Sequence, residues 1–307
     1  MTGGSRLHFA DRLAALVDER RSRVVLGLDP DPAALWPGTA QATSGDARLA
    51  RVNTAEAVVE HCRAAIVAAG PACVAVKLQL ACFERLGGPG WEALERTIAI
   101  ARDHGLLVIA DGKRGDVPVT AGAYAQALVG ETPGPYGPVP GLGADAFTAN
   151  PLLGRDALEP LLEAAAAAGA GCFVLVRTSN PGAAELQDEG APPLHERLAR
   201  IVDELGADAT GESGLSSVGA VTGATEPGLL ARLRELMPRA IFLLPGVGAQ
   251  GGRVEDLAAA FEPHPAAGLV TASRSIVNAH EERGGDPSRA AADAAEELRV
   301  AAWSVSA

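Results

Sequence analysis

Lysine is the residue that this sequence avoids most. Of the 26 cationic side chains in its 307 residues, only Lys77 and Lys113 are lysines, and the other 24 are arginines. Lysine is ordinarily among the commonest residues of globular proteins. It differs from arginine in having a compact charge and an ammonium that can release its proton within an enzyme's working range. We therefore expect the two retained lysines to do something that a fixed positive charge cannot.

Basic and aromatic residues are also scarce. The net charge is −12, which argues against a nucleic-acid-binding surface, because duplex binding needs a clustered basic face. An anionic small molecule stays possible if a few cations converge in one cleft. Aromatic residues make up 4% of the chain and apolar residues 48%. We therefore expect an aliphatic, alanine-rich core of the kind that joins helices to a parallel sheet.

Metal-binding cysteine patterns and long apolar runs are missing too. Cys62, Cys73, Cys82 and Cys172 form no CxxC pair and show no zinc-ligand spacing, so we interpret them as small core residues in a reducing compartment. No apolar run reaches 18 residues, and the first 13 residues lack the apolar centre of a signal sequence. A soluble cytoplasmic protein without membrane contacts is the expectation.

Apolar runs alternate with segments of helical periodicity along the chain. The apolar runs predict eight strands, at 24–28, 73–78, 106–110, 145–149, 172–177, 217–222, 241–245 and 268–272. Helical spacing predicts helices at 48–69, 90–103, 117–129, 155–168, 194–205, 226–236, 253–261 and 287–302, and one at about 8–20 that would cap one end of the domain. Continuous apolar strands separated by helices indicate a parallel sheet with both faces covered. The pattern predicts an α/β protein, a single (β/α)8 barrel domain over residues 1–307, rather than an open doubly wound sheet.

Three long loops interrupt this rhythm, and the one at 206–216, rich in glycine and acidic residues, carries no readable signal. The proline- and glycine-rich segment at about 130–144 follows a helix, so in a barrel it would be a surface insertion on the face away from the chemistry. The segment 180–193 follows a strand and would lie on the functional face. A flexible lid and an ordinary long loop are both consistent with it.

Polar side chains follow nearly every predicted strand. The carboxyl ends of the strands build the functional face of a (β/α)8 barrel, so these side chains should share one site. They are Asp29, Lys77, Asp111, Lys113, Asp116, Asn150, Thr178, Ser179, Thr225, Gln250 and Arg274. Loops are polar in any protein, but chance is a poor explanation for finding both lysines there.

The densest charge lies in residues 111–116, DGKRGD, at the end of a predicted buried strand. Unpaired ions are costly to desolvate, so this cluster needs partners or a purpose. Two carboxylates could hold a metal ion, but an ammonium between them competes for the same oxygens. A structural cluster of salt bridges is a second possibility. We favour a catalytic array of Lys77, Asp111, Lys113 and Asp116, whose alternating charges keep one another ionised.

A glycine-rich turn follows the seventh predicted strand. Residues 245–252, PGVGAQGG, contain G-x-G-x-x-G, and the eighth strand is followed by Ser273-Arg274-Ser275. A dinucleotide-binding turn would belong in the first strand–helix unit, with an acidic residue about 20 positions on. Plain turn glycines are the other alternative. Backbone amides after strands 7 and 8, joined by an arginine, are typical of a phosphate site in a barrel, which we favour.

The motif at 111–117, DGKRGDV, resembles the D-x-K-x-x-D-[IV] signature of the orotidine 5'-phosphate decarboxylase family, in its longer bacterial D-x-K-R-G-D variant. The resemblance extends over essentially the whole chain. It includes LGLDPDP, VKLQLACFE, FTANPLLG, RTSNPGA, VTGAT, PGVGAQGG and SRSI. One departure is Pro118 directly after the motif, which is tolerable in a first helical turn.

The resemblance implies a (β/α)8 barrel that decarboxylates orotidine 5'-monophosphate to uridine 5'-monophosphate in pyrimidine biosynthesis. It further implies a homodimer with a shared active site and no metal or organic cofactor. Lys77, Asp111 and Lys113 would supply the charged array of one site, and Asp116 with Thr120 would reach into the partner's site. Asp29 and Lys77 would contact the ribose, Ser179 the pyrimidine, and Gln250 with Arg274 the phosphate. Asn150 and Thr178 complete the expected substrate-binding set.

Under this interpretation Lys113 would stabilise a carbanion at C6 and then protonate it. Asp111 would lie near the departing carboxylate. One rival is a metal-dependent sugar-phosphate enzyme on a related barrel, such as a 3-keto-gulonate-phosphate decarboxylase or a hexulose-phosphate synthase. Another is a non-catalytic nucleotide-binding protein, against which the intact lysine–aspartate array argues.

Overall fold

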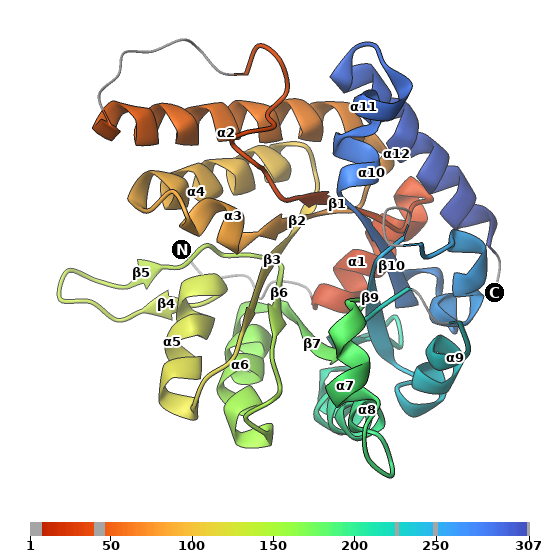
Figure 1. Cartoon of the computed structure of the whole chain (residues 1–307). Coiled ribbons are helices and arrows are strands. Elements are labelled where there is room, and N and C mark those ends of the chain that lie inside the picture. The colour runs from red at the N-terminus through yellow and green to blue at the C-terminus, as the bar shows by residue number, and fades with distance from the viewer. Residues whose placement is uncertain (1–7, 40–46, 225–226, 248–250, 306–307) are drawn as a thin grey trace.

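The computed structural model describes residues 8–39, 47–224, 227–247 and 251–305. Eight parallel strands close into a barrel in the order β1-β2-β3-β6-β7-β8-β9-β10 (Figure 1). Their bounds are β1 (Val24–Leu28), β2 (Ala75–Gln79), β3 (Leu107–Arg114), β6 (Ala146–Ala149), β7 (Gly171–Arg177), β8 (Ser216–Thr222), β9 (Ala240–Pro245) and β10 (Gly268–Ala272). The predicted (β/α)8 barrel is confirmed, and each predicted strand overlaps an observed one.

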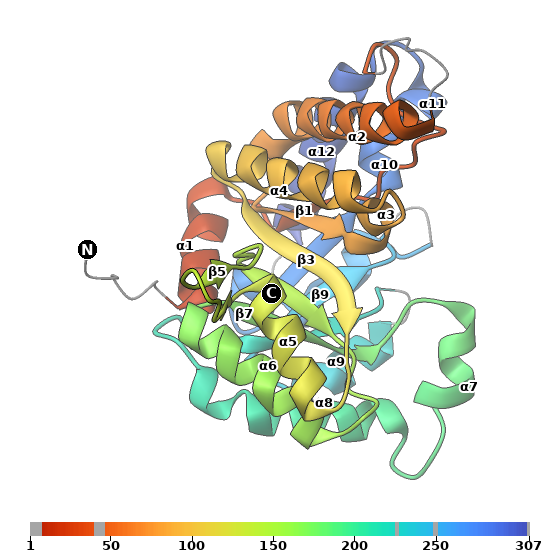
Figure 2. The ribbon, with the colours of Figure 1, turned by 90° about the vertical axis from the view of Figure 1, so that its left-hand side faces the viewer.

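Helices surround the barrel (Figures 1 and 2). They are α1 (Phe9–Arg20), α2 (Ala47–Ala69), α3 (Leu80–Glu84), α4 (Gly88–Asp103), α5 (Pro118–Leu128), α6 (Arg155–Ala168), α7 (Ala184–Gln187), α8 (Leu194–Leu205), α9 (Pro227–Leu236), α10 (Arg274–Val277), α11 (Ala279–Arg283) and α12 (Pro287–Ser304). Five 3-10 helices complete the described elements: η1 (Gly70–Ala72), η2 (Pro181–Ala183), η3 (Ala207–Ala209), η4 (Val254–Phe261) and η5 (Pro265–Ala267). The prediction of an α-helix at 253–261 was wrong in type, since this segment is the 3-10 helix η4. No helix in the described ranges is long and apolar enough to cross a membrane.

Helix α1 covers the end of the barrel where the strands begin, opposite to α7 (Figure 2). Its buried residues Phe9, Leu13 and Val17 belong to the same apolar cluster as the inward-facing strand residues. Phe9 also meets Phe173 of β7 edge to face, with ring centroids 6.0 Å apart. The helix therefore closes the end of the barrel where the strands begin, so a cavity inside the barrel opens at the other end.

Alanine and aliphatic side chains dominate the buried residues, as predicted. Three of the four cysteines, Cys62, Cys73 and Cys172, are buried, while Cys82 is only partly so, and all four are free thiols. Burial raises the pKa of Cys62 and of Cys73 to about 12. The buried thiols therefore act as small apolar residues.

Arginines join the strand starts to neighbouring segments. Arg234 is buried and donates to the carbonyls of four residues in three segments: Met237, Ala240, Ala260 and Ala267. Arg20, at the end of α1, bonds in the same way to the carbonyls of Gly70, Cys73, His104 and Gly105. The guanidinium suits this task because it presents several donors in a fixed planar fork.

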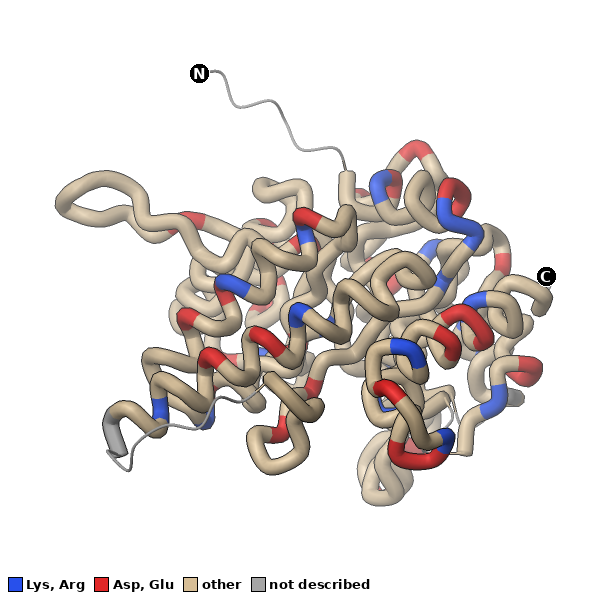
Figure 3. The backbone as a smooth tube through the Cα atoms, turned by 90° about the horizontal axis from the view of Figure 1, so that it is seen from above, with Lys and Arg blue, Asp and Glu red and all other residues tan. Residues whose placement is uncertain are grey.

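The segment 130–144 forms a short antiparallel hairpin of β4 (Glu131–Thr132) and β5 (Val139–Pro140). It projects from the body of the protein and has no charged residue between Glu131 and Asp145 (Figure 3). Figure 2 shows β5 on the side of the barrel where α1 lies. The segment is thus a surface hairpin with two short strands of its own.

Candidate active site

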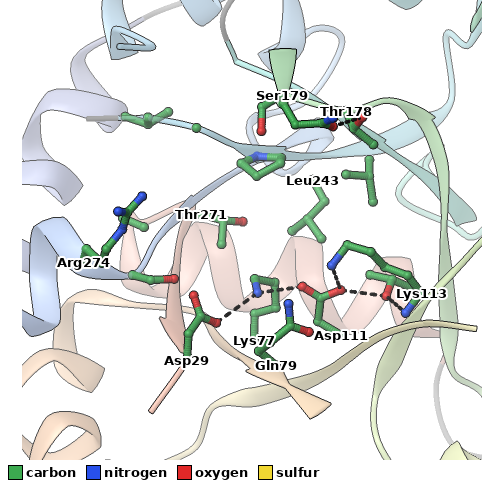
Figure 4. Close-up of a pocket in the computed structure, with 18 of the residues that line it drawn as sticks. Asp29, Lys77, Gln79, Asp111, Lys113, Thr178, Ser179, Leu243, Thr271 and Arg274 are labelled. Atoms are coloured by element: carbon green, nitrogen blue, oxygen red, sulfur yellow. Dashed lines mark hydrogen bonds and ion pairs between the residues drawn. The ribbon is translucent and has the colours of Figure 1, made fainter. Parts of the chain in front are cut away.

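A cavity of about 370 Å³ opens at the carboxyl ends of the strands (Figure 4). Seven of the predicted site residues line it: Asp29, Lys77, Asp111, Lys113, Thr178, Ser179 and Arg274. These residues come from five strands and their following turns, so the barrel brings together what the sequence spreads over some 250 positions. Gln250 and Thr225 lie outside the described residues.

Four charged side chains form a continuous chain across the cavity floor. Lys77 Nζ lies 3.6 Å from Asp29 Oδ1 and 2.7 Å from Asp111 Oδ2. The second oxygen of Asp111 lies 2.7 Å from Lys113 Nζ. Charges of alternating sign therefore run from Asp29 to Lys113 (Figure 4). Each buried ion has a partner of opposite sign, which is the condition for keeping ions in a desolvated site.

The two inner members of this chain are held in their ionised forms. Burial alone would raise the pKa of Asp111, but the charges of Lys77 and Lys113 outweigh it and hold that pKa at about 2. Burial likewise disfavours the charged form of Lys77, yet Asp111 and Asp29 raise its pKa above the ordinary lysine value. Asp111 therefore has no proton to give near neutral pH. A proton donor in this array must be a lysine.

The two lysines differ in their surroundings. The Lys77 side chain is 9% exposed and sits between two carboxylates. The Lys113 side chain is 40% exposed and contacts the single carboxylate of Asp111. Lys77 is thus enclosed by protein, whereas Lys113 has room for a reacting molecule beside it.

The backbone conformation of the 111–116 motif fixes the position of Lys113. Strand β3 runs further than predicted, to Arg114, and its register against β6 shifts between Ala110 and Arg114. Within this irregularity Lys113 has a φ of +48°, in the left-handed region that residues with a side chain rarely adopt. Its N–H donates to Thr148 Oγ1 at 2.8 Å. Strained residues persist where the surroundings hold them, and they cluster at functional sites.

Both glycines of the motif lie in close packing, and the backbone contact at Gly115 is the one that excludes a side chain. A Cβ on Gly115 would lie 2.6 Å from the carbonyl oxygen of Asn150, and one on Gly112 would lie 2.8 Å from Leu80. Asn150 also donates its backbone N–H to the Arg114 carbonyl. Val117 is extended, with φ −57° and ψ 154°, as expected for a residue before proline, and α5 starts at Pro118. Pro118 is therefore accommodated as the first residue of the helix.

The opposite end of the cavity suits an anion. Arg274 lies there, at the start of α10, and Figure 4 places it across the cavity from Lys113. Gly246, with a φ of +104°, and the residues Ser273 and Ser275 line the same end. The described residues that were predicted to bind phosphate thus lie together at one end of the cavity, and Gln250 lies outside the described residues.

Three predicted site residues do not line the cavity: Asp116, Thr120 and Asn150. Asp116 is not part of the ionic chain, and its carboxylate accepts a hydrogen bond from the N–H of Val117 at 2.8 Å. Thr120 is exposed on α5. Asn150 accepts a bond from the Leu152 N–H at 3.0 Å. A single chain therefore brings together Lys77, Asp111 and Lys113 of the expected array and leaves Asp116 outside the cavity.

Several residues that line the cavity were missed. Thr148, in the middle of β6, donates to Asp111 Oδ1 at 2.8 Å and so links the carboxylate to the Lys113 backbone. Thr271 is buried, and its hydroxyl has no partner in the described part of the chain. Gln79 also lines the site. A polar residue at an inward-facing strand position was the available signal for Thr148 and Thr271.

A metal site has no support from the described residues, in which no group of three or more His, Cys, Asp or Glu side chains could hold an ion. This finding applies to the protein side chains alone.

Comparison with known proteins agrees with the geometry. The family model described as Orotidine 5'-phosphate decarboxylase / HUMPS family matches residues 22–286. Orotidine 5'-phosphate decarboxylase of Deinococcus radiodurans is 41% identical over 269 residues, which cover 87% of this chain and 88% of the relative. That of Haloarcula marismortui is 42% identical over 281 residues, covering 90% and 89%. The solved structure of Leishmania donovani OMP decarboxylase superposes with a TM-score of 0.69 at 30% identity, covering 96% of this chain and 99% of that one.

Proposed function

Since the chain belongs to the orotidine 5'-phosphate decarboxylase / HUMPS family and decarboxylates orotidine 5'-monophosphate to uridine 5'-monophosphate, we propose that Lys113 is the group that protonates the product carbon. The observation that carries this proposal is the ionic chain from Asp29 to Lys113, which ends in the more accessible of the only two lysines. Every other charged member is committed to a partner on the cavity floor. Lys113 alone combines a transferable proton with space beside it.

The reaction needs fixed charge because the pyrimidine ring offers no electron sink. When the C6–carboxylate bond breaks, its electron pair stays in an sp2 orbital at C6 that the ring cannot delocalise, and CO2 leaves. A preorganised ammonium stabilises that developing charge without reorganising during the reaction. Lys113 then gives its proton to C6, forming the C6–H bond, and the neutral amine regains a proton from solvent.

Asp111 has two tasks in this proposal. It holds Lys113 in place through the 2.7 Å ion pair. Being ionised, with a pKa of about 2, it also places a negative charge near the substrate carboxylate. Repulsion between the two carboxylates raises the ground state and is relieved as CO2 departs. Lys77 neutralises the far side of Asp111 and limits the cost of burying it.

The remaining cavity residues would bind the nucleotide. Arg274 with Gln250 would hold the phosphate, Asp29 with Lys77 the ribose, and Ser179 beside Thr178 the pyrimidine. The separation of Arg274 from Lys113 across the cavity supports this assignment, since the ribose separates the phosphate on its C5' from the base on its C1' (Figure 4). Binding energy gained at the phosphate can then align the ring beside Lys113.

A homodimer with a shared active site belongs to the same proposal. Asp116 and Thr120 lie outside the cavity of their own chain, on a surface with four exposed apolar side chains: Val117, Val119, Leu152 and Leu153. Exposed apolar side chains beside polar ones are typical of protein–protein contacts. A second copy docked there would bring Asp116 and Thr120 to its own cavity. Asn150, at 2.6 Å from the position of a Gly115 Cβ, would support the motif rather than touch the substrate.

Subunit mixing tests the shared site. Inactive Lys113→Ala and Asp116→Ala chains, once exchanged, should recover roughly a quarter of wild-type turnover, because half of the dimers are mixed and each holds one complete site. Subunit exchange is confirmed separately with differently tagged chains. No recovery after confirmed exchange would remove Asp116 from the partner's site.

Cofactor-free chemistry is tested by absorbance. Consumption of orotidine 5'-monophosphate should proceed at an unchanged rate in EDTA. Loss of turnover that returns with a divalent metal would instead favour the metal-dependent sugar-phosphate enzymes of the HUMPS side of the family. A cytoplasmic location is also proposed, and the four free thiols support it.

A further inference from the structure

The segment that follows β7 is tied back to the end of that strand by two consecutive residues, Gln187 and Asp188, which we call the strap. Arg177, the last residue of β7, is buried and holds Asp188 by two parallel bonds, Nε–Oδ1 at 2.8 Å and Nη2–Oδ2 at 2.9 Å. The hydrogen bond from Arg177 holds the pKa of Asp188 below its usual range. Bidentate pairs of this kind fix orientation as well as distance.

Gln187 completes the attachment with its side-chain amide. Its Oε1 accepts the N–H of Thr178 at 2.7 Å, and its Nε2 donates to Thr178 Oγ1 at 3.0 Å. The Thr178 hydroxyl in turn donates to Asn180 Oδ1 at 2.6 Å. Thr178 lies just beyond the strand, so Gln187 supplies the acceptor for its N–H and extends the ordered backbone toward Ser179.

His195, in the first turn of α8, links the strap to that helix. Its Nδ1 lies 2.8 Å from the Gln187 carbonyl oxygen and 3.2 Å from Asp188 Oδ1. Because a carbonyl oxygen only accepts, Nδ1 must carry the hydrogen. His195 is buried, so this contact sits on the rigid body of α8 rather than in solvent.

On the side away from the strap, Ser179 packs against Gly223, the residue just after β8. A Cβ on Gly223 would lie 3.0 Å from Ser179 Cα and 3.2 Å from its Cβ. The turn formed by Thr178, Ser179 and Asn180 is thus held between Gly223 and the strap. All three residues of this turn line the cavity, whereas Gln187 and Asp188 do not.

We propose that Gln187 and Asp188 are positioning residues that set the affinity of the site for the pyrimidine by fixing Ser179 against Gly223. They act through the turn, without touching the substrate. The inference rests on the proposed contact between Ser179 and the pyrimidine. It assigns a task to the long segment after β7, for which the sequence was consistent with both a flexible lid and an ordinary loop.

The test compares a ligand that has the base with one that lacks it. Inhibition constants of uridine 5'-monophosphate and ribose 5-phosphate are measured for Gln187→Ala, Asp188→Asn, Ser179→Ala and the wild type. Both strap variants should raise the inhibition constant of uridine 5'-monophosphate about tenfold, the scale of one lost hydrogen bond. The inhibition constant of ribose 5-phosphate should stay unchanged. Glu185→Gln, an exposed change in α7 of the same segment, is the matched control and should alter neither constant.

Three results would overturn the inference, and they are distinguishable. If Ser179→Ala loses base affinity but the strap variants do not, the strap is not a positioning device and the assignment of Ser179 stands. If Ser179→Ala keeps base affinity, the assignment of Ser179 is wrong and the inference ends with it. If the strap variants bind both ligands more weakly by the same factor, the strap supports the structure in general and does not position Ser179 for the base.

Gly223→Ala provides an independent variant in case the strap variants fold poorly. It displaces Ser179 from the opposite side and leaves the strap intact. It should reduce affinity for uridine 5'-monophosphate and spare ribose 5-phosphate. Unchanged affinity for both ligands would show that the position of Ser179 does not set base affinity.

Discussion

The two ends of the barrel use buried cations in opposite ways. Where the strands begin, Arg234 donates to neutral backbone carbonyls and lies over the Phe242 ring, and burial lowers its pKa to about 9. Where the strands end, Lys77 lies between Asp29 and Asp111, which raise its pKa against the effect of burial. One end uses a cation as a hydrogen-bonding fork that joins segments. The other end uses a cation as one member of a chain of ion pairs.

This difference explains why arginine suits one end of the barrel and lysine the other. A planar fork reaches several carbonyls at once, which a single ammonium cannot do with the same geometry. A compact ammonium can release its proton to a neighbouring carbon, which a guanidinium does not do in proteins. The comparison predicts that exchanging the two residue types should damage stability at one end and chemistry at the other.

The largest effect is expected for Lys113→Arg. The charge is kept but the transferable proton is lost, so turnover should fall at least about a thousandfold, as for other groups that stabilise a transition state directly. Affinity for uridine 5'-monophosphate should stay within roughly tenfold, or 1.4 kcal/mol. Steady-state kinetics and inhibition constants measure the two effects. Turnover above a few per cent of wild type would show that positive charge alone is sufficient.

The reciprocal exchange, Arg234→Lys, should come next. A lysine cannot reach four carbonyls, so buried acceptors lose their donor and the free energy of unfolding should drop by about 2–4 kcal/mol. Urea denaturation measures this loss. The exposed Arg253 provides a control, and Arg253→Lys should change stability by less than about 0.5 kcal/mol. A KM that changes in Arg234→Lys while stability does not would contradict the division between the two ends.

Acid should lower the free energy of unfolding by about 2 kcal/mol through Asp111 at one end of the barrel, and not through Arg234 at the other. The folded pKa of Asp111, about 2, is below its unfolded value of roughly 3.9, so its contribution to stability is present above pH 4 or so and is lost as pH falls toward 2. The wild type should therefore lose unfolding free energy relative to Asp111→Asn over that window, by about 2 kcal/mol. Arg234 bonds only to neutral carbonyls, so Arg234→Lys should show the same acid dependence as the wild type. Equal acid sensitivity of Asp111→Asn and wild type would place the titrating group elsewhere.

The smallest effect is expected for Thr148→Val, which removes a hydroxyl but keeps the shape. Asp111 loses one donor and the Lys113 N–H loses its acceptor. Turnover should fall about tenfold, the scale of one or two hydrogen bonds, with little change in KM. Thr54→Val, whose exposed hydroxyl bonds only to a carbonyl in its own helix, serves as the control. A pronounced rise in KM with normal kcat would mean that Thr148 binds substrate instead of orienting the array.

Sequence periodicity was sufficient for the barrel because each strand is buried on both faces and therefore reads as a continuous apolar run. It misjudged η4, since a 3-10 helix buries the same side chains as an α-helix over eight residues. It ended β3 too early, because Gly112 and Lys113 interrupt the apolar run while the backbone continues through a bulge.

The residues that line the cavity were predictable where a charged or polar residue stands just after a strand, as for Asp29 and Arg274, or near the end of a predicted strand, as for Lys77. Thr148 was missed because it lies inside a four-residue strand, and a hydroxyl there resembles an ordinary β-branched residue. The strap was missed for a different reason. Its contact with Arg177 joins positions eleven apart across an irregular segment, and no periodic pattern encodes such a contact.

The accessibility of Lys113 also makes this chain a convenient target for chemical labelling. Lys77 is enclosed between two carboxylates, and every other basic side chain except histidine is an arginine. An amine-directed acylating reagent therefore meets one accessible lysine, at the reacting end of the cavity. Acylation of this lysine, distinguished from that of the α-amino group by peptide mapping, would report occupancy, because a bound nucleotide shields the amine from the reagent.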